Sequence, residues 1–233
     1  LLHQGVSREH RLESIDQANH SSYFRNLDVD LARRKQKTRS RHASLVMKIG
    51  IYGGAFDPVH HGHLILAREA RETFGLEKII FVPAAVSPFK QSPAASPKMR
   101  LLMLQAAIEG ENEFVLDDCE LRRPPPSYTI DTVEEIRRRE ADAEIYYLIG
   151  EDNVSTLGKW HRFTELEKIV RFVVFDRTQA GTKHDYPPVH RRIDISATEI
   201  RKRVAAGRSI RYFVPRSVEE IIDRQKLYQE QVK

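Results

Sequence analysis

A glycine-rich turn between an apolar run and a helix-forming run constrains this chain more than any other feature. The turn spans residues 53–63 and reads GGAFDPVHHGH, after the apolar run 49–52 and before the helix-forming run 64–74. Glycines let the backbone approach an anion, and a helix start offers N–H groups and the positive end of a dipole. Because His60 lies just before the helix and His63 in its first turn, we expect both imidazoles to face one bound phosphate.

Other interpretations of this turn fit the spacing less well. A P-loop needs Lys-Ser or Lys-Thr after its glycines and a dinucleotide fingerprint needs G-x-G-x-x-G, and the turn has neither. Three histidines within four residues suit zinc, but no H-E-x-x-H and no cysteine pair accompany them. A tight turn with exposed histidines is the remaining alternative. The combination of strand, glycines and Asp-Pro favours a built phosphate site, and we predict no metal held by the protein alone.

The basic charge of the chain is concentrated in its first 46 residues. They hold nine Lys/Arg and five Asp/Glu, whereas the other 187 residues hold 29 and 28. The segment 1–46 also has little apolar periodicity, so we interpret it as a flexible basic extension before a domain that spans 47–233. A basic extension can bind RNA, but the near-neutral charge of the remainder argues against nucleic acid as a partner of the domain.

The single cysteine and the lack of long apolar runs bear on location. Cys119 excludes an internal disulfide and is typical of a reducing cytoplasm, and the alternation around it predicts a strand residue. The sequence contains no run of about 18 apolar residues, so we expect no membrane-spanning helix. No apolar signal-peptide core is visible at its start. We therefore expect a cytoplasmic protein with no membrane partner, and leave its oligomeric state open.

From Met47 onward, strand patterns alternate with helix patterns. The expected strands are 48–52, 78–82, 114–117, 144–149 and 171–175, and the expected helices are 62–74, 97–109, 128–140, 163–169, 197–206 and 218–228. Ser96, Ser127, Ser196 and Ser217 are expected N-caps, and Gly207 is expected to end the helix from 197. The order predicts an α/β fold with a doubly wound, mainly parallel sheet and a small helical C-terminal part. Ligands bind such sheets beyond the carboxyl ends of the strands.

Four further stretches contain candidate ligand-binding residues, and two of them directly follow expected strands. They are the proline-rich loop 83–90 with Lys90, the helix start 127–132, the segment 150–161 with Asp152 and Trp160, and the helix start 194–201. Each stretch also has an ordinary structural explanation. Lys90 can be a solvated lysine, Ser127 an N-cap, Asp152 an N-cap and Trp160 a core residue. The stretch 194–201 can be a capped helix with a solvated arginine. A helix start with hydroxyls and an arginine one turn later is nevertheless well suited to a phosphate.

These stretches together resemble the nicotinate-mononucleotide adenylyltransferases of the HxGH nucleotidyltransferase superfamily. The first turn is similar to the signature Gly-Gly-x-Phe-Asp-Pro-x-His-x-Gly-His, and residues 195–201 are similar to Ile-Ser-x-Thr-x-Ile-Arg. Residues 127–132 resemble Ser-Tyr-Thr-x-Asp-Thr, and 159–160 resemble the family's Lys-Trp. Phe89 stands where the family commonly has histidine, and Pro125 where it often has glycine.

The resemblance implies a Rossmann-like nucleotidyltransferase that joins ATP to nicotinate mononucleotide in NAD biosynthesis, with Mg²⁺ accompanying ATP. The implied catalytic residues are His60, His63 and Arg201. The implied ATP-binding residues are Gly53, Gly54, Phe56, His60, His63, Ser196, Thr198 and Arg201. The implied mononucleotide-binding residues are Lys90, Tyr128, Thr129, Asp152, Trp160 and Arg177. A nucleotide-binding regulator and an RNA-binding protein remain the alternatives from other functional classes.

Overall fold

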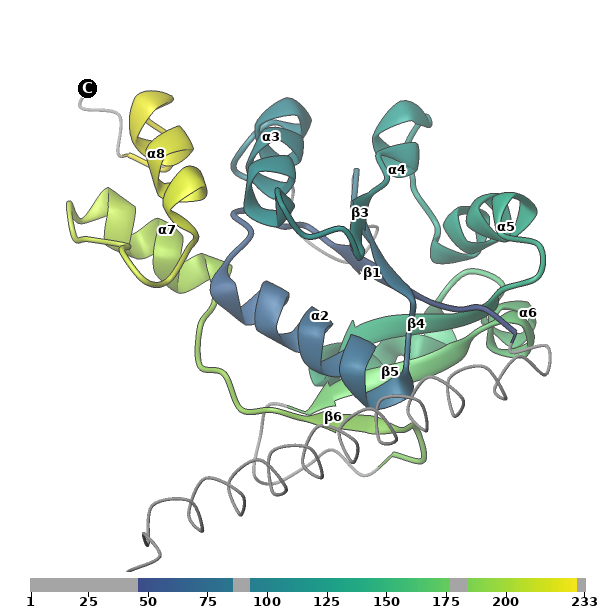
Figure 1. Cartoon of the computed structure of the whole chain (residues 1–233). Helices are drawn as coiled ribbons and strands as arrows, with labels where there is room; N and C mark the ends of the chain where they lie inside the picture. Colours follow the sequence, from purple (N-terminus) through teal and green to yellow (C-terminus); the bar gives the residue numbers. More distant parts are fainter. Residues whose placement is uncertain (1–45, 86–92, 177–183, 230–233) are drawn as a thin grey trace, which may run out of the picture. The chain divides into compact units, whose positions relative to one another are not determined.

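A six-stranded sheet, with every strand parallel to its neighbours, forms the centre of the molecule (Figure 1). The computed structural model describes residues 46–85, 93–176 and 184–229. The strands are β1 (Lys48–Gly54), β2 (Lys78–Pro83), β3 (Phe114–Leu116), β4 (Glu144–Gly150), β5 (Arg171–Asp176) and β6 (Pro188–His190). Their order across the sheet is β3-β2-β1-β4-β5-β6. The order reverses between β1 and β4, which is where doubly wound sheets bind ligands.

Helices cover both faces of the sheet, as the alternating pattern predicts. They are α2 (His61–Phe74), α3 (Pro97–Ile108), α4 (Cys119–Arg122), α5 (Thr129–Arg139), η1 (Glu151–Lys159), α6 (Phe163–Ile169), α7 (Ala197–Ala205) and α8 (Arg216–Arg224). One apolar core joins α2, α3, α7 and α8 to one face, and a second joins α4, α5, η1 and α6 to the other. The predicted doubly wound α/β class is therefore confirmed, with α7 and α8 as the small C-terminal part.

The central strands are apolar on both sides because each face is covered. Ile49 and Ile51 of β1 belong to the core beneath α5, whereas Tyr52 belongs to the core beneath α2. Gly50 has no room for a side chain, since an ideal Cβ would lie 2.5 Å from Cδ1 of Ile79. Burial on both faces explains why the strands read as continuous apolar runs.

Several expected details were wrong. Ser127 is not the N-cap of α5, because the helix begins at Thr129 with Tyr128 before it, and the Ser127 hydroxyl lies 3.5 Å from the Glu120 carbonyl oxygen. Ser217 lies inside α8, where its hydroxyl donates to the Ala106 carbonyl. Cys119 begins the short helix α4 and is not a strand residue. For Ser217, a contact with a residue 111 positions away overrides the local capping preference.

Other predicted helix ends were confirmed. The hydroxyls of Ser96 and Ser196 accept the backbone N–H groups of Met99 and Glu199, at 3.3 and 3.1 Å. Gly207 follows α7 with a φ of +63°, the left-handed conformation in which glycine costs least. No helix in the ranges that the structure describes is long and apolar enough to cross a membrane.

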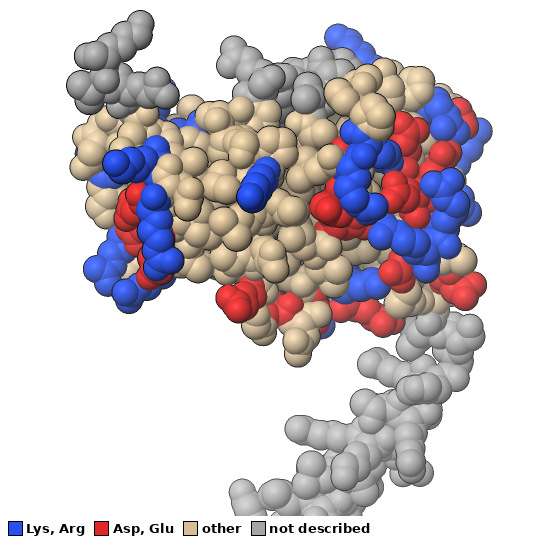
Figure 2. All heavy atoms as spheres, turned by 90° about the horizontal axis from the view of Figure 1, so that it is seen from above, with Lys and Arg blue, Asp and Glu red and all other residues tan. Residues whose placement is uncertain are grey.

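Positive and negative side chains alternate on the side of the molecule that carries α4 and α5. Arg122 pairs with Asp118, Arg123 with Glu135, and Arg162 with Glu134. Figure 2, which looks down on Figure 1 from above, shows red and blue side chains intermixed there. The face drawn in Figure 2 therefore presents charges of both signs, as the balanced composition of 47–233 predicts.

Candidate active site

Two glycines end β1 because side chains there would collide with aromatic groups. An ideal Cβ on Gly53 would lie 2.7 Å from the hydroxyl oxygen of Tyr147, and one on Gly54 would lie 3.0–3.3 Å from the ring of Phe56. Phe56 itself has a φ of +47°, is buried, and packs edge-on against His63 with ring centroids 5.0 Å apart. The turn thus leaves bare backbone at the carboxyl end of β1, beside the reversal point of the sheet.

The two histidines of the motif lie together at the start of α2, as predicted. His60 occupies the N-cap and His63 the third helical position, and their rings stack with centroids 3.7 Å apart. The His60 backbone N–H donates to Nδ1 of His63 at 3.2 Å, which orients that ring. An ideal Cβ on Gly62 would lie 2.9 Å from Nδ1 of His60, so a glycine is needed between the two. One expected donor is already used, because the His61 N–H donates to the Phe213 carbonyl at 2.9 Å.

Asp57 holds the motif turn in place through contacts that the sequence alone does not reveal. Its carboxylate accepts the backbone N–H groups of Ala94 and Ala95 at 2.7 and 3.0 Å, and the hydroxyl of Tyr228 at 2.7 Å. The carboxylate is 5% exposed, so these donors replace water. Burial raises the pKa of Tyr228, and the negative charge of Asp57 raises it further, which keeps the phenol protonated as a donor.

Two arginines fasten the same turn from different helices. Nη1 of Arg201, on α7, donates to the Asp57 carbonyl at 2.7 Å, and its Nη2 lies 3.3 Å from the Thr198 hydroxyl. Nη1 of the fully buried Arg100, on α3, donates to the Ala55 carbonyl at 2.8 Å. The predicted second motif on α7 therefore meets the first motif, although 144 residues separate Arg201 from Asp57.

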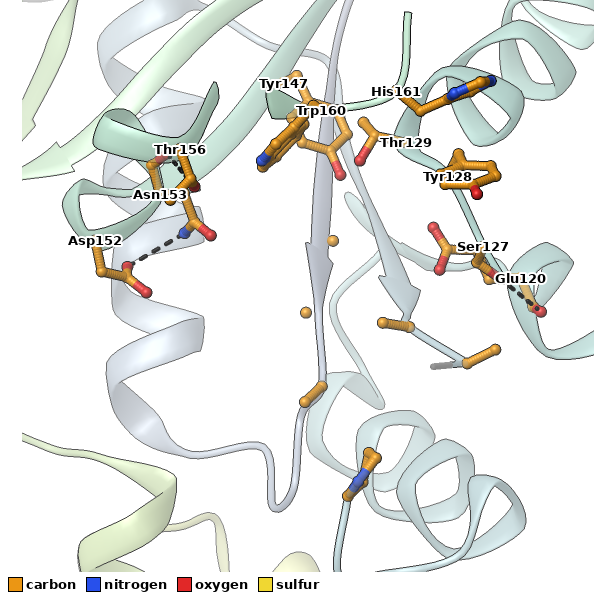
Figure 3. Close-up of a pocket in the computed structure, with 16 residues that line it drawn as sticks. Glu120, Ser127, Tyr128, Thr129, Tyr147, Asp152, Asn153, Thr156, Trp160 and His161 are labelled. Carbon is orange, nitrogen blue, oxygen red and sulfur yellow. Dashed lines mark hydrogen bonds between the residues drawn. The ribbon is translucent and has the colours of Figure 1, made fainter. Parts of the chain in front are cut away.

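A pocket of about 320 Å³ opens on the other side of the glycine turn (Figure 3). It is lined by Gly53, Gly54, Ala55, Ala84, Ala85, Pro93, Glu120, Ser127, Tyr128, Thr129, Tyr147, Asp152, Asn153, Thr156, Trp160 and His161. The lining thus comes from the carboxyl ends of β1 and β2, from β4, and from the starts of α5 and η1. Four predicted mononucleotide residues, Tyr128, Thr129, Asp152 and Trp160, share this pocket with Gly53 and Gly54.

Aromatic rings form one wall of the pocket. Trp160 packs edge-on against Tyr147 and Phe172, with centroids 6.1 and 6.3 Å apart, and this packing fixes the indole plane. Tyr128 and His161 lie with their rings 4.3 Å apart at the rim. Burial raises the pKa of Tyr147, so its hydroxyl stays protonated beneath the glycine turn. Flat rings at this wall suit a planar ligand.

The predicted residues therefore fall into two groups joined by the glycine turn. The pocket residues belong to the α5 and η1 side. The α2 and α7 side carries the other described residues: Phe56, His60, His63, Ser196, Thr198 and Arg201. Lys90 and Arg177 lie outside the described residues. Asp57 was predicted only as part of the motif, and Arg100, Glu120 and Tyr147 were not predicted as site residues. The buried positions of these last three between apolar neighbours carry no local signal of a polar role.

The fold and this site define a class, the Rossmann-like α/β proteins that bind nucleotides at the reversal point of a parallel sheet. A family model described as cytidylyltransferase-like matches residues 51–203. The chain belongs to this family. The match includes both histidines of the first motif and Arg201 of the second.

Similar proteins with an assigned name narrow the family assignment further. The chain is 40% identical over 189 residues to a "probable nicotinate-nucleotide adenylyltransferase" of Exiguobacterium sibiricum, covering 78% of this chain and 99% of that one. It is 42% identical over 186 residues to one from Shouchella clausii, covering 78% and 96%. A Plasmodium falciparum nicotinic acid mononucleotide adenylyltransferase complexed with NaAD superposes with a TM-score of 0.68 over 80% of this chain and 100% of that one. At 17% identity this last likeness shows the fold alone.

Proposed function

We propose that this chain is a nicotinate-nucleotide adenylyltransferase, which joins nicotinate mononucleotide to ATP and releases pyrophosphate and nicotinate adenine dinucleotide. The names of the bacterial relatives, at about 40% identity over nearly their whole length, support this activity. The observation that carries the proposal is the pocket, in which Trp160, Tyr128 and Thr129 share walls with the glycine turn of the HxGH motif. A planar base and a phosphate can therefore be held within one ligand's reach.

The reaction depends on positioning the substrates and neutralising charge more than on acid–base chemistry. A phosphate oxygen of the mononucleotide attacks the α-phosphorus of ATP, and the bond to the β-phosphate oxygen breaks as pyrophosphate leaves. That phosphate is already anionic at neutral pH, so no general base is needed. Catalysis then rests on alignment and on donors aimed at the developing charge.

We assign the phosphate-handling roles to the α2 and α7 side. His60 and His63 hold ATP phosphates and stabilise the transition state, while Ser196, Thr198 and Arg201 bind the leaving pyrophosphate. Gly53, Gly54 and Phe56 shape the turn that the nucleotide approaches. Two contacts support these roles: the His60–His63 stack, and the Arg201 bond to the turn.

We assign recognition of the nicotinate group to the α5 and η1 side. Trp160 stacks on the ring, backbone N–H groups at Tyr128 and Thr129 meet the carboxylate, and Asp152 binds a hydroxyl of the ribose. The start of α5 favours an anion through its dipole, and Tyr128 lies at its N-cap. Lys90 and Arg177 are proposed phosphate contacts on sequence grounds alone.

A divalent ion would accompany ATP in this reaction, because the ATP phosphates supply the oxygen ligands that such an ion prefers. Among the described residues, no three His, Cys, Asp or Glu side chains are grouped to hold a metal. The nearby Asp57 carboxylate is occupied by three donors. We propose Mg²⁺, held by ATP phosphates and water, where it would neutralise charge on the phosphates. A cytoplasmic location stays a prediction.

The decisive experiment measures pyrophosphate release from ATP with either nicotinate mononucleotide or its amide form. We expect the acid form to have the higher kcat/KM, because a carboxamide NH₂ facing an N–H donor leaves both groups unsatisfied. Trp160→Leu should raise the KM for the mononucleotide and leave the KM for ATP unchanged. Phe163→Leu is the matched control, since Phe163 packs on Phe172 outside the pocket lining. A preference for the amide would refute the acid assignment, and no release with either would refute the activity.

A further inference from the structure

Among the described residues that line the pocket, there are two carboxylates and one histidine, but no lysine or arginine. The carboxylates belong to Glu120 and Asp152, and the histidine is His161. Figure 3 shows Asp152 on one side of the pocket and Glu120 on the other, with Trp160 between them. This charge is unexpected in a site proposed to bind the carboxylate of nicotinate.

Glu120 is held firmly at the pocket wall. Its carboxylate accepts the hydroxyl of Thr132 at 2.8 Å and the backbone N–H of Ala85, and it is 6% exposed. Arg123 donates to the same Thr132 hydroxyl and pairs with Glu135. Burial raises the pKa of Glu120 above its ordinary value, and the Thr132 hydrogen bond, Arg123 and the Ala85 N–H offset only part of this rise. The carboxylate thus links the loop after β2 to α5, both of which line the pocket.

The chemistry of the proposed substrate gives this negative charge a purpose. The ring nitrogen of nicotinate mononucleotide is bonded to ribose and carries a fixed positive charge, which no pH change removes. The reduced, dihydropyridine form has nearly the same shape and an uncharged ring. A buried carboxylate such as that of Glu120 stabilises a nearby cation more than it would in water, and the indole face of Trp160 acts in the same direction.

We propose that Glu120 is a specificity-determining residue that favours mononucleotides with a positively charged pyridinium ring over those with an uncharged ring of the same shape. The inference rests on the proposed function, because it assumes that the pyridine ring occupies this pocket. The negative carboxylate and the positive ring of the zwitterionic base would then be bound by different groups of the protein. The N–H groups at the start of α5 receive the carboxylate, and the acidic wall favours the ring.

The test compares kcat/KM for nicotinate mononucleotide and for its dihydropyridine form at fixed ATP. The wild-type protein should prefer the cationic ring. Glu120→Gln keeps an oxygen that accepts the Thr132 hydroxyl but removes the charge, so it should lower the preference at least about tenfold, as expected for a charge pair within about 10 Å at an effective dielectric of about 20. The loss should fall on the cationic substrate alone.

Glu135→Gln is the matched control, because it removes a carboxylate from the same hydrogen-bonded group without touching the pocket lining. It should keep the wild-type preference. An equal loss for both substrates in Glu120→Gln would show a merely structural role and overturn the inference. If that variant fails to fold, equal kcat/KM values for the two rings in the wild-type protein would overturn it as well.

Failure of the broader function has a separate signature. A wild-type protein that releases no pyrophosphate with nicotinate mononucleotide refutes the adenylyltransferase assignment and this inference together. Normal turnover of nicotinate mononucleotide with an unchanged ring preference in Glu120→Gln refutes the inference alone.

Discussion

The imidazole rings of His60 and His63 stack with centroids 3.7 Å apart and planes inclined by 26°. Two rings this close act as one unit, because a shift of either ring displaces the other. His63 also lies against Phe56 and Tyr52, with centroids 5.0 and 6.0 Å away. Apolar packing therefore sets the direction of the groups that we propose to face the ATP phosphates.

The first prediction concerns His63 directly. His63→Ala should leave the fold intact and lower kcat about a hundredfold, the usual cost of losing one donor to a developing oxyanion. His61→Ala is the control, because the contact of His61 with Phe213 uses its backbone N–H and survives the substitution. Steady-state pyrophosphate release measures both variants. Near-normal turnover in a folded His63→Ala protein would remove His63 from the mechanism.

The second prediction tests the space beside His60. In Gly62→Ala the new methyl group would lie 2.9 Å from Nδ1 of His60 and 3.4 Å from Cγ2 of Ile193, so the His60 ring must move. We expect kcat to fall about a hundredfold, the cost of misplacing a catalytic group by about 1 Å. Helix loss is not the cause, since alanine favours a helix over glycine by about 1 kcal/mol.

Gly158→Ala provides the comparison, because nothing lies within 4 Å of its ideal Cβ. It should keep wild-type turnover. Circular dichroism and pyrophosphate release on both variants distinguish a local displacement from unfolding. Equal activity of the two alanine variants would contradict the proposed need for glycine between the histidines.

The third prediction concerns stability in acid. Burial alone would raise the pKa of Asp117, but hydrogen bonds from Arg139 and the Cys119 N–H bring it below its ordinary value. A lowered folded pKa gives stability that is present above about pH 3.8 and lost as the pH falls through the folded pKa. Asp117→Asn should therefore cost about 1–3 kcal/mol at pH 7 and much less at pH 2.

Urea unfolding at both pH values measures this difference. Asp118→Asn is the neighbouring control, since Asp118 pairs with Arg122 at an exposed site and should change stability little. A constant destabilisation by Asp117→Asn between pH 7 and pH 2 would show that its charge is not responsible.

The fourth prediction addresses the first 46 residues, which lie outside the described structure except for Val46. A chain trimmed to 47–233 should bind heparin less tightly, because the removed segment carries most of the basic excess. Adenylyl transfer should persist at the full-length rate. Heparin elution and pyrophosphate release test the two statements separately, and loss of activity in a folded trimmed chain would contradict the domain boundary at Met47.

The sequence predicted the fold well because its strands are buried on both faces and its helices are periodic. The strand β6 was missed, since Pro188–His190 spans three residues and begins with proline, which is tolerated only at such edge positions. The helix α4 was missed because four residues carry no periodicity. The motif residues that the structure describes lie at one sheet edge, since parallel topology brings strand ends together, whereas Lys90 and Arg177 lie outside the described residues.

The supporting polar residues could not be predicted, because their partners lie far away in the sequence. Glu120 reads as an ordinary surface acid until Thr132 and Ala85 are folded around it. Tyr147 reads as a strand residue, and only the path of β1 places its hydroxyl beneath Gly53. A sequence pattern reports local periodicity, whereas these roles arise from tertiary contacts.

The bond between Tyr228 and Asp57 has a consequence for how the protein is made. The phenol and the carboxylate are 171 residues apart, so a ribosome that has completed the glycine turn must still add nearly all of the domain before this donor exists. During that interval the Asp57 carboxylate lacks the Tyr228 hydroxyl as a donor. The turn that carries the signature histidines therefore gains this donor only when the domain is nearly complete, and a chain that ends before Tyr228 lacks it.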